Sequence, residues 1–297
     1  MVMTRRRFLK LGLAGTGSVV AAGIGVEQLV SRGVLPGKHF LDVITGACSV
    51  SSPPLHFAPV LGPSRSGSFF SHARNRRVGY TIAYPPGHEP GDRLPLIVML
   101  HGFGGDHRNA LSSMTPAQAV GLRHLPPLAM VTVDGGGGYW NPHPGDDPLG
   151  MVIDELIPLC RRQGLGRQRI GAMGISMGGY GALLFAEKYP QLFGAVAAIS
   201  PAIWTTYAEA HAANAGAFAS AEAFAAADVI AHVGALAGKP VRVASGNDDP
   251  FHPGVVALTR VLPRSATVDL SGGCHTGPFF VSQEPASLAF LGEHLVQ

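Results

Sequence analysis

Cysteine is scarce in this chain of 297 residues, which contains only Cys48, Cys160 and Cys274. An odd number leaves at least one cysteine unpaired or paired between molecules, and the sequence does not fix the pairing. No two cysteines form a C-x-x-C pair, and no histidines and cysteines have the spacing of a zinc site. We therefore expect no structural metal ion.

Charged residues are also few, at 14% of the chain against 46% hydrophobic residues, so a sizeable core is expected and disorder is not. The formal net charge is +3, and residues 1–30 account for all of it, because they hold four basic residues and one acidic residue. The remainder is neutral. A nucleic-acid partner would require a basic face, so we expect no nucleic-acid binding.

Residues 1–30 have the organisation of an export signal. A cationic start is followed by an uncharged apolar run, Leu11–Val26. As a helix this run would span about 24 Å, short of the roughly 30 Å hydrocarbon core of a membrane, which favours a signal peptide. The stretch TRRRFLK, residues 4–10, resembles the twin-arginine export motif of bacteria. We predict a bacterial protein that is exported, secreted or associated with the cell envelope, with any membrane association confined to this segment. No clean A-x-A site follows, so cleavage and retention as an anchor both stay open.

The rest of the chain divides into a lead-in and one catalytic domain. Residues 31–75 are rich in proline, serine and glycine, and we predict that they form an exposed lead-in. Residues 76–297 are predicted to form the catalytic domain. Apolar runs bounded by glycine or proline predict strands within 76–87, 94–102, 128–138, 193–201, 239–246 and 265–273. Helices are predicted at 115–123, 149–163, 179–188 and 285–296. Alternating strands and helices indicate an α/β fold with a mostly parallel central sheet flanked by helices. The alanine-rich residues 202–235 exceed a usual connection and suggest a small helical cap.

Ser176 lies in a G-x-S-x-G motif, after a short strand predicted at RIGAMG, residues 169–174, and before the helix predicted at 179–188. A nucleophile elbow requires this context, because the serine occupies a strained turn and its neighbours must be small for strand and helix to approach. The helix N-terminus also favours developing negative charge. The alternative is a glycine-rich turn with an idle serine.

A nucleophilic serine needs a base, and the base needs an orienting acid. His275 follows the last predicted strand, and Asp248 and Asp249 follow the strand before it. The order serine, acid, histidine places each residue at the carboxyl end of a strand, where open α/β sheets form their sites. Adjacent side chains cannot both face one imidazole, so the acid is Asp248 or Asp249.

An oxyanion hole is predicted from the stretch LHGFGGDH, residues 100–107, which follows a buried strand. The backbone N–H of Phe103 or Gly104 is expected to act with that of Met177, and we adopt Phe103. After another strand, Asp134, Tyr139 and Trp140 are candidates to line a substrate pocket, because aromatic faces suit sugars and apolar groups. The alternative for these three is an ordinary packed loop.

Together these stretches resemble the esterase D-like branch of the α/β-hydrolases, which includes S-formylglutathione hydrolases, feruloyl and acetyl esterases and secreted mycolyltransferases. The matching stretches are LHGFGG, IDELIPLC, GISMGGYGALLFAEKYP, AISPAIW, GNDDPF and GCHTGPFF, and they extend over about residues 78–295. The resemblance implies an acyl-enzyme mechanism without a metal or organic cofactor, and it favours Asp249, which directly precedes Pro-Phe. Cys274 departs from the pattern, because relatives often have a small residue such as glycine there.

We therefore predict an exported serine esterase with Ser176, Asp249 and His275 as its triad, acting on a small-molecule or glycan ester. The alternatives are an acyltransferase that uses a sugar hydroxyl, a serine peptidase, and a non-catalytic cell-envelope binding module.

Overall fold

The computed structural model describes Cys48 and residues 62–112, 127–167 and 169–295. The chain divides into two units, Met1–Ser49 and Val50–Gln297, and the fold below is that of the second. The predicted export signal and the helix predicted at 115–123 lie outside the described residues. Within the described ranges, no helix combines the length and hydropathy required to span a membrane.

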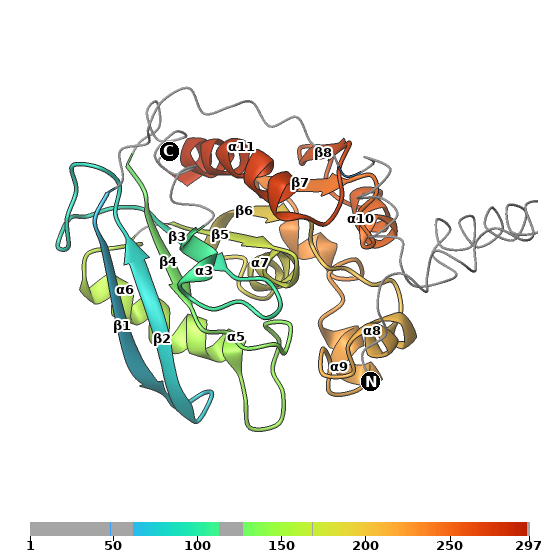
Figure 1. The fold of residues 1–297 in the computed structure, drawn as a ribbon, viewed down its shortest axis with the longest axis horizontal. Helices are drawn as coiled ribbons and strands as arrows, with labels where there is room; N and C mark the ends of the chain where they lie inside the picture. Colours follow the sequence, from blue (N-terminus) through green and yellow to red (C-terminus); the bar gives the residue numbers. More distant parts are fainter. Residues whose placement is uncertain (1–47, 49–61, 113–126, 168, 296–297) are drawn as a thin grey trace, which may run out of the picture. The chain divides into compact units, whose positions relative to one another are not determined.

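Eight strands form one mixed sheet in the order β1-β2-β4-β3-β5-β6-β7-β8 (Figure 1). Strands β3 to β8 pair in parallel, whereas β1 and β2 are antiparallel to their neighbours. The alternation of strands and helices predicted such a mostly parallel sheet, and the resemblance to the α/β-hydrolases implied it. The strands are β1 (Ser64–Ser71), β2 (Arg76–Ala83), β3 (Leu96–Leu100), β4 (Ala129–Val133), β5 (Ile170–Ile175), β6 (Phe193–Ile199), β7 (Val241–Gly246) and β8 (Thr267–Ser271).

Strand β1 corrects the predicted start of the domain, because it lies within residues 31–75, the segment predicted to be an exposed lead-in. It pairs with β2 along its whole length, from Ser64 opposite Ala83 to Ser71 opposite Arg76. Its sequence, SRSGSFFS, is rich in serine and glycine, and most of its residues are exposed at the edge of the sheet. An edge strand of this composition lacks the apolar run by which the other strands were predicted.

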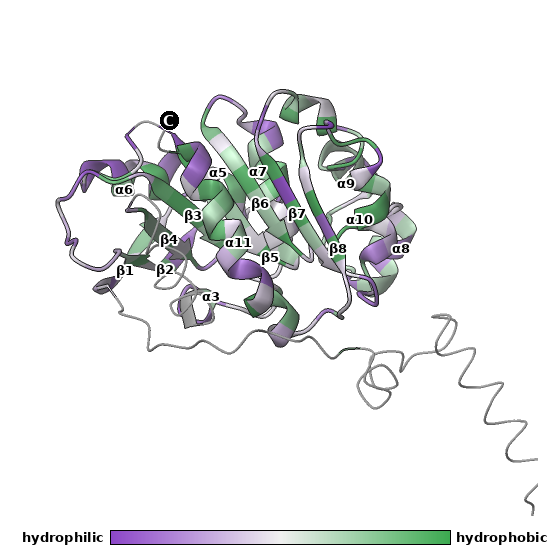
Figure 2. Cartoon of the chain, turned by 90° about the horizontal axis from the view of Figure 1, so that it is seen from above, coloured by the Kyte–Doolittle hydropathy of each residue, from purple (hydrophilic) through white to green (hydrophobic). Residues whose placement is uncertain are grey.

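Helices cover both faces of the sheet and produce two hydrophobic cores. Alternate residues of β3 point to opposite faces, so that Leu96, Val98 and Leu100 pack in one core and Ile97 and Met99 in the other. Figure 2 shows the apolar colouring of the central strands between these layers. The helices outside the cap are α3 (Asn109–Ser112), α5 (Pro148–Gly150), the π-helix η3 (Met151–Leu156), α6 (Ile157–Arg162), α7 (Met177–Lys188), α10 (His252–Thr259) and α11 (Gly277–Leu295).

Between β6 and β7 the chain forms three short helices, α8 (Tyr207–Ala213), α9 (Ala221–Ala226) and the 3₁₀-helix η4 (Val233–Leu236), in the segment predicted as a helical cap. Helix α8 begins with a capping box, in which the Thr206 hydroxyl accepts from the Glu209 N–H and the Glu209 carboxylate accepts from the Thr206 N–H. Helix α9 is capped by the Ser220 hydroxyl. These caps explain how short alanine-rich helices are held at defined start points.

Candidate active site

Ser176 lies on a sharp turn between β5 and α7, with φ +58° and ψ −122°. Left-handed backbone is rare for a residue with a side chain, and such strain persists only where the surroundings impose it. A Cβ at Gly174 would collide with the Gly178 carbonyl, and one at Gly178 with the Leu100 carbonyl, so both positions require glycine for close approach. The turn therefore presents the Ser176 hydroxyl at the carboxyl edge of the sheet.

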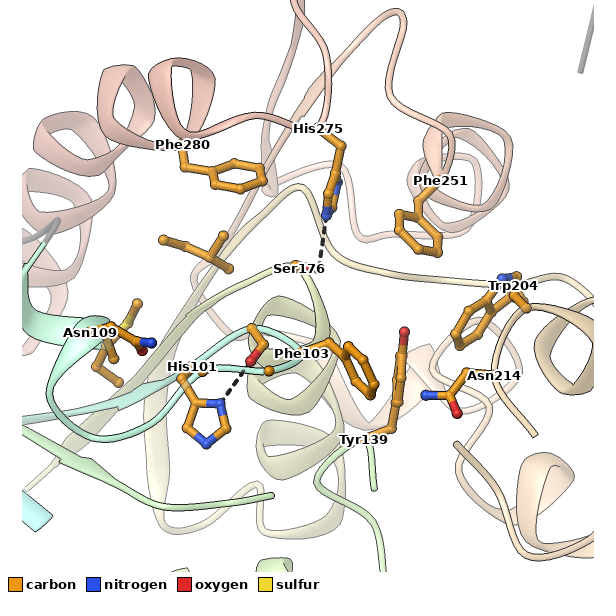
Figure 3. Close-up of a pocket in the computed structure, with 17 residues that line it drawn as sticks. His101, Phe103, Asn109, Tyr139, Ser176, Trp204, Asn214, Phe251, His275 and Phe280 are labelled. Atoms are coloured by element: carbon orange, nitrogen blue, oxygen red, sulfur yellow. Dashed lines mark hydrogen bonds between the residues drawn. The ribbon is translucent and has the colours of Figure 1, made fainter. Parts of the chain in front are cut away.

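His275 joins this serine to a carboxylate. The Ser176 Oγ–H donates to His275 Nε2 at 2.8 Å (Figure 3), and the His275 Nδ1–H donates to Asp249 Oδ2 at 2.8 Å. The rings of Phe251 and Phe280 meet the imidazole edge-on, with centroids at 5.1 and 5.0 Å. The imidazole is thus fixed by two hydrogen bonds and by aromatic contacts with two phenylalanine rings.

Of the two adjacent acids, Asp249 is the one that bonds the imidazole. Its carboxylate is fully buried, and its second oxygen accepts the Phe251 N–H at 2.8 Å. Asp248 is half-buried, and its own N–H donates to the Gly273 carbonyl. A buried carboxylate with both oxygens hydrogen-bonded is suited to hold one imidazole orientation.

The two predicted oxyanion donors, Phe103 and Met177, belong to the loop after β3 and to the start of α7. Met177 directly follows Ser176 and begins α7, whose first N–H groups have no acceptors within the helix. Gly102 and Phe103 line the same pocket as Ser176, and a Cβ at Gly102 would lie 3.5 Å from the Ser176 Cβ. The loop after β3 and the start of α7 therefore meet at Ser176, and Phe103 and Met177 stay the predicted oxyanion donors.

A pocket of about 680 Å³ opens above Ser176. In Figure 3, Asn109 and Phe280 lie on one side of the serine, and Tyr139, Trp204, Asn214 and Phe251 lie on the other. The second side is mostly aromatic, and the Tyr139 and Trp204 rings meet with centroids at 4.8 Å. Such a wall suits a planar ring or the apolar face of a sugar.

Two polar groups face into this aromatic side. Burial raises the pKa of Tyr139, so its hydroxyl stays neutral and is able to donate or accept. The Asn214 Oδ1 accepts from the Gly216 N–H at 2.9 Å, which leaves its Nδ2 as the donor directed to the pocket. The wall therefore offers neutral hydrogen-bonding groups and no charge.

Of the three residues predicted to line the pocket, only Tyr139 does so. Trp140 is fully buried behind the pocket, and its indole N–H donates to the His101 carbonyl at 3.2 Å. Asp134 is also absent from the pocket wall, because its carboxylate accepts the N–H groups of Gly79 and His107. For Asp134 and Trp140 the alternative of a packed loop describes the structure better.

The sequence did not single out Trp204, Asn214, Phe251 or Phe280 as parts of the site. Phe251 and Phe280 follow the triad acid and histidine by a few residues, and the quoted stretches GNDDPF and GCHTGPFF contained them. Trp204 ends another quoted stretch, AISPAIW, whereas Asn214 comes from the alanine-rich part of the segment between β6 and β7, which matches no quoted stretch. Only its folding over the carboxyl edge of the sheet brings them to the pocket.

The three cysteines are in two different states. Cys48 and Cys274 are disulfide-bonded, and Cys160 is free and buried, with burial raising its pKa to about 12. The residue directly before the predicted base, Cys274, therefore carries no free thiol. Among the residues that the structure describes, no three histidine, cysteine, aspartate or glutamate side chains gather as a metal site.

Comparisons with known proteins show the family of the chain and its fold. A family model described as “Putative esterase” matches residues 71–254, whereas no curated protein matches the chain. Similar solved structures include a ferulic acid esterase (TM-score 0.69, 16% identity, 80% of this chain and 100% of that one). An S-formylglutathione hydrolase from Agrobacterium tumefaciens is similar (TM-score 0.65, 18% identity, 80% of this chain and 98% of that one). So is a ferulic acid esterase from Anaeromyces mucronatus in complex with ferulic acid (TM-score 0.60, 15% identity, 82% of this chain and 97% of that one).

Proposed function

The chain belongs to this esterase family, and from that premise we propose that it is an exported serine esterase acting through an acyl-enzyme on Ser176. The observation that carries the proposal is the position of His275, which is hydrogen-bonded to Ser176 on one side and to Asp249 on the other, each at 2.8 Å. A nucleophile, a base and an orienting acid in this arrangement activate a hydroxyl that is otherwise a weak nucleophile.

In the first half of the reaction, Ser176 Oγ attacks the ester carbonyl carbon while its proton passes to His275 Nε2. The buried Asp249 carboxylate stabilises the imidazolium that forms. The carbonyl oxygen becomes an oxyanion and accepts the N–H groups of Phe103 and Met177, aided by the positive end of the α7 dipole. The tetrahedral intermediate then collapses, and His275 gives its proton to the departing alcohol.

In the second half, water takes the place of the alcohol. His275 removes a proton from water as the oxygen attacks the acyl carbon, a second oxyanion forms in the same hole, and the acid leaves as Ser176 recovers its proton. No metal or organic cofactor takes part in any of these steps.

We propose an ester with a planar or ring-shaped group as the substrate. The aromatic side of the pocket, with Tyr139, Trp204 and Phe251, supports this, as does the naming of ferulic acid for two of the similar structures. A sugar ring would also fit such a wall, so that an acyltransferase using a sugar hydroxyl in place of water is the second candidate. Measuring free acid against acylated sugar, with and without sugar acceptors, distinguishes the two.

A fluorophosphonate probe tests the proposal directly. We expect it to label the folded wild-type protein at Ser176, and Ser176→Ala to lose both labelling and hydrolysis of short-chain and hydroxycinnamate esters. A folded wild-type protein that is not labelled refutes the serine esterase and leaves the non-catalytic binding module. Labelling with hydrolysis of peptides and not of esters instead establishes the peptidase.

Export is the second part of the proposal, and the twin arginines of the leader support it. Fusing residues 1–47 to a reporter that is active only outside the cytoplasm tests it in a bacterium with a twin-arginine pathway. We expect Arg5→Lys with Arg6→Lys to abolish export, whereas Arg7→Lys keeps the pair and preserves it. Equal export of all three fusions refutes this route.

A further inference from the structure

Tyr139 and Trp140 form an unusual pair, because both have left-handed backbone, with φ +52° and +58°. Each such residue costs about 1–3 kcal/mol, which the surrounding structure must offset. The two left-handed residues send consecutive rings to different places. Tyr139 lines the pocket, whereas Trp140 is fully buried behind it. The strained backbone therefore lies at the wall of the active site.

The indole of Trp140 occupies a space that two glycines leave open. A Cβ at Gly135 would collide with the six-membered ring, and a Cβ at Gly181 on α7 would lie 2.7 Å from Cγ and Cδ1. Phe185 on the same helix meets the indole edge-on, with centroids at 6.1 Å. The ring is thus enclosed on both sides and has one position available.

From this position the indole reaches the loop that carries the predicted oxyanion donor. Its N–H donates to the His101 carbonyl at 3.2 Å, and the Gly135 N–H donates to His101 Nε2 at 2.9 Å. His101 Nδ1 lies 2.8 Å from the Gly102 carbonyl, so Nδ1 carries the proton and Nε2 accepts. Burial lowers the pKa of His101, in agreement with this neutral form. The backbone is therefore held two residues before Phe103.

The far end of the same loop, at His107, is held by Asp134. The Asp134 carboxylate accepts the His107 N–H at 2.9 Å and the Gly79 N–H at 2.8 Å, while Arg74 donates to the Asp134 carbonyl. Residues 134–140 thus hold the loop at both His101 and His107. Between them, Gly104 has φ +73° and the Gly105 N–H closes a turn on the Gly102 carbonyl.

We infer that Trp140 is a positioning residue for the oxyanion hole: its buried indole fixes the His101 carbonyl and thereby the direction of the Phe103 N–H. This inference rests on the proposed serine esterase mechanism. An oxyanion donor acts only when it points to the place where negative charge develops, and losing one donor costs about 10²–10³ in kcat. Trp140 itself contacts no substrate, so its effect should appear in the transition state and not in substrate binding.

The test is Trp140→Phe, which keeps an aromatic ring and removes the N–H donor. We expect kcat for p-nitrophenyl acetate to fall about tenfold, less than the loss of a whole donor, because the Phe103 amide is displaced and not deleted. KM should stay unchanged, and the rate of fluorophosphonate labelling should fall in step with kcat, since the phosphoryl oxygen occupies the same hole. Gly181→Ala, which displaces the indole from the α7 side without altering any hydrogen-bonding group, should give the same pattern.

Phe193→Leu is the matched control, because Phe193 on β6 is also a fully buried ring, but it packs on Phe185 and lines neither the indole site nor the pocket. It should lower Tm while leaving kcat and labelling rate unchanged. A folded Trp140→Phe or Gly181→Ala protein with wild-type kcat and labelling rate overturns the inference, as does a control that loses kcat to the same extent. If the wild-type protein itself is not labelled, the proposed function fails first, so the two failures are distinguishable.

Discussion

Glu187 on α7 is a buried acid with an unusual environment, and it provides a quantitative test of the fold. It is 6% exposed, and one of its carboxyl oxygens has no hydrogen-bond partner among the described residues. Burial and the nearby carboxylate of Asp228 raise its pKa from 4.5 to about 8, against the opposing charge of Lys188. The same helix binds the end of α9, because the Tyr180 hydroxyl and the Lys188 ammonium donate to the carbonyls of Ala227 and Ala226.

The direction of the pH effect follows from the two pKa values. In the unfolded chain Glu187 ionises near pH 4.5, whereas in the folded protein it keeps its proton up to about pH 8. The folded state therefore binds more protons over this interval, and the free energy of unfolding falls as pH rises through it. Each pKa unit corresponds to about 1.4 kcal/mol, so the interval from 4.5 to about 8 sets an upper limit of about 5 kcal/mol.

Glu187→Gln removes this pH-dependent loss of stability, because the amide has the shape of the protonated acid and does not ionise. We expect the variant and the wild-type protein to have similar free energies of unfolding near pH 4.5, and the variant to be the more stable by a few kcal/mol above about pH 8. Urea unfolding of both proteins at a series of pH values measures the difference, in which the titration of all other groups cancels. Glu222→Gln on exposed α9 is the matched control, and it should not become more stable than the wild-type protein at high pH. A difference between Glu187→Gln and wild type that is constant with pH refutes the reasoning.

Four further substitutions test the site. Asp249→Asn should lower kcat by about 10⁴ by favouring the wrong imidazole tautomer, whereas Asp248→Asn should leave kcat near wild type, as steady-state kinetics on one ester will show. Gly178→Ala should prevent folding or expose the core, because its Cβ collides with the Leu100 carbonyl, and a circular dichroism melt identical to wild type would contradict this. Tyr139→Phe should raise KM for hydroxycinnamate esters without altering Tm, and an unchanged KM would remove its hydroxyl from substrate binding.

The central sheet and the order of the reactive residues are predictable from the sequence for a physical reason. Parallel strands buried on both faces must be continuous apolar runs, and each of those runs here ends in glycine or a polar residue. Ser176 and Asp249 follow such runs, His275 follows the exposed edge strand β8, and the carboxyl ends of parallel strands meet along one edge. Local pattern and global position therefore agree for these three residues.

The pocket wall is less predictable because it depends on backbone conformations that leave no pattern. Tyr139 and Trp140 are adjacent aromatic residues after a run of glycines, and nothing in the sequence distinguishes the ring that faces the substrate from the ring behind it. Their left-handed φ angles separate them. Asn214 reaches the pocket only through the path of α8, which is determined by caps and tertiary packing and not by an apolar period.

The edge-on contacts of Phe251 and Phe280 with His275 divide the pocket into two kinds of wall. Both phenylalanines line the pocket and also brace the imidazole, so a change of shape there disturbs proton transfer as well as substrate choice. Ala213 and Asn214 line the same pocket from the end of α8 without a ring contact to the histidine. Variation at the end of α8 is thus the route by which this enzyme would acquire new substrates while its proton transfer chemistry stays intact.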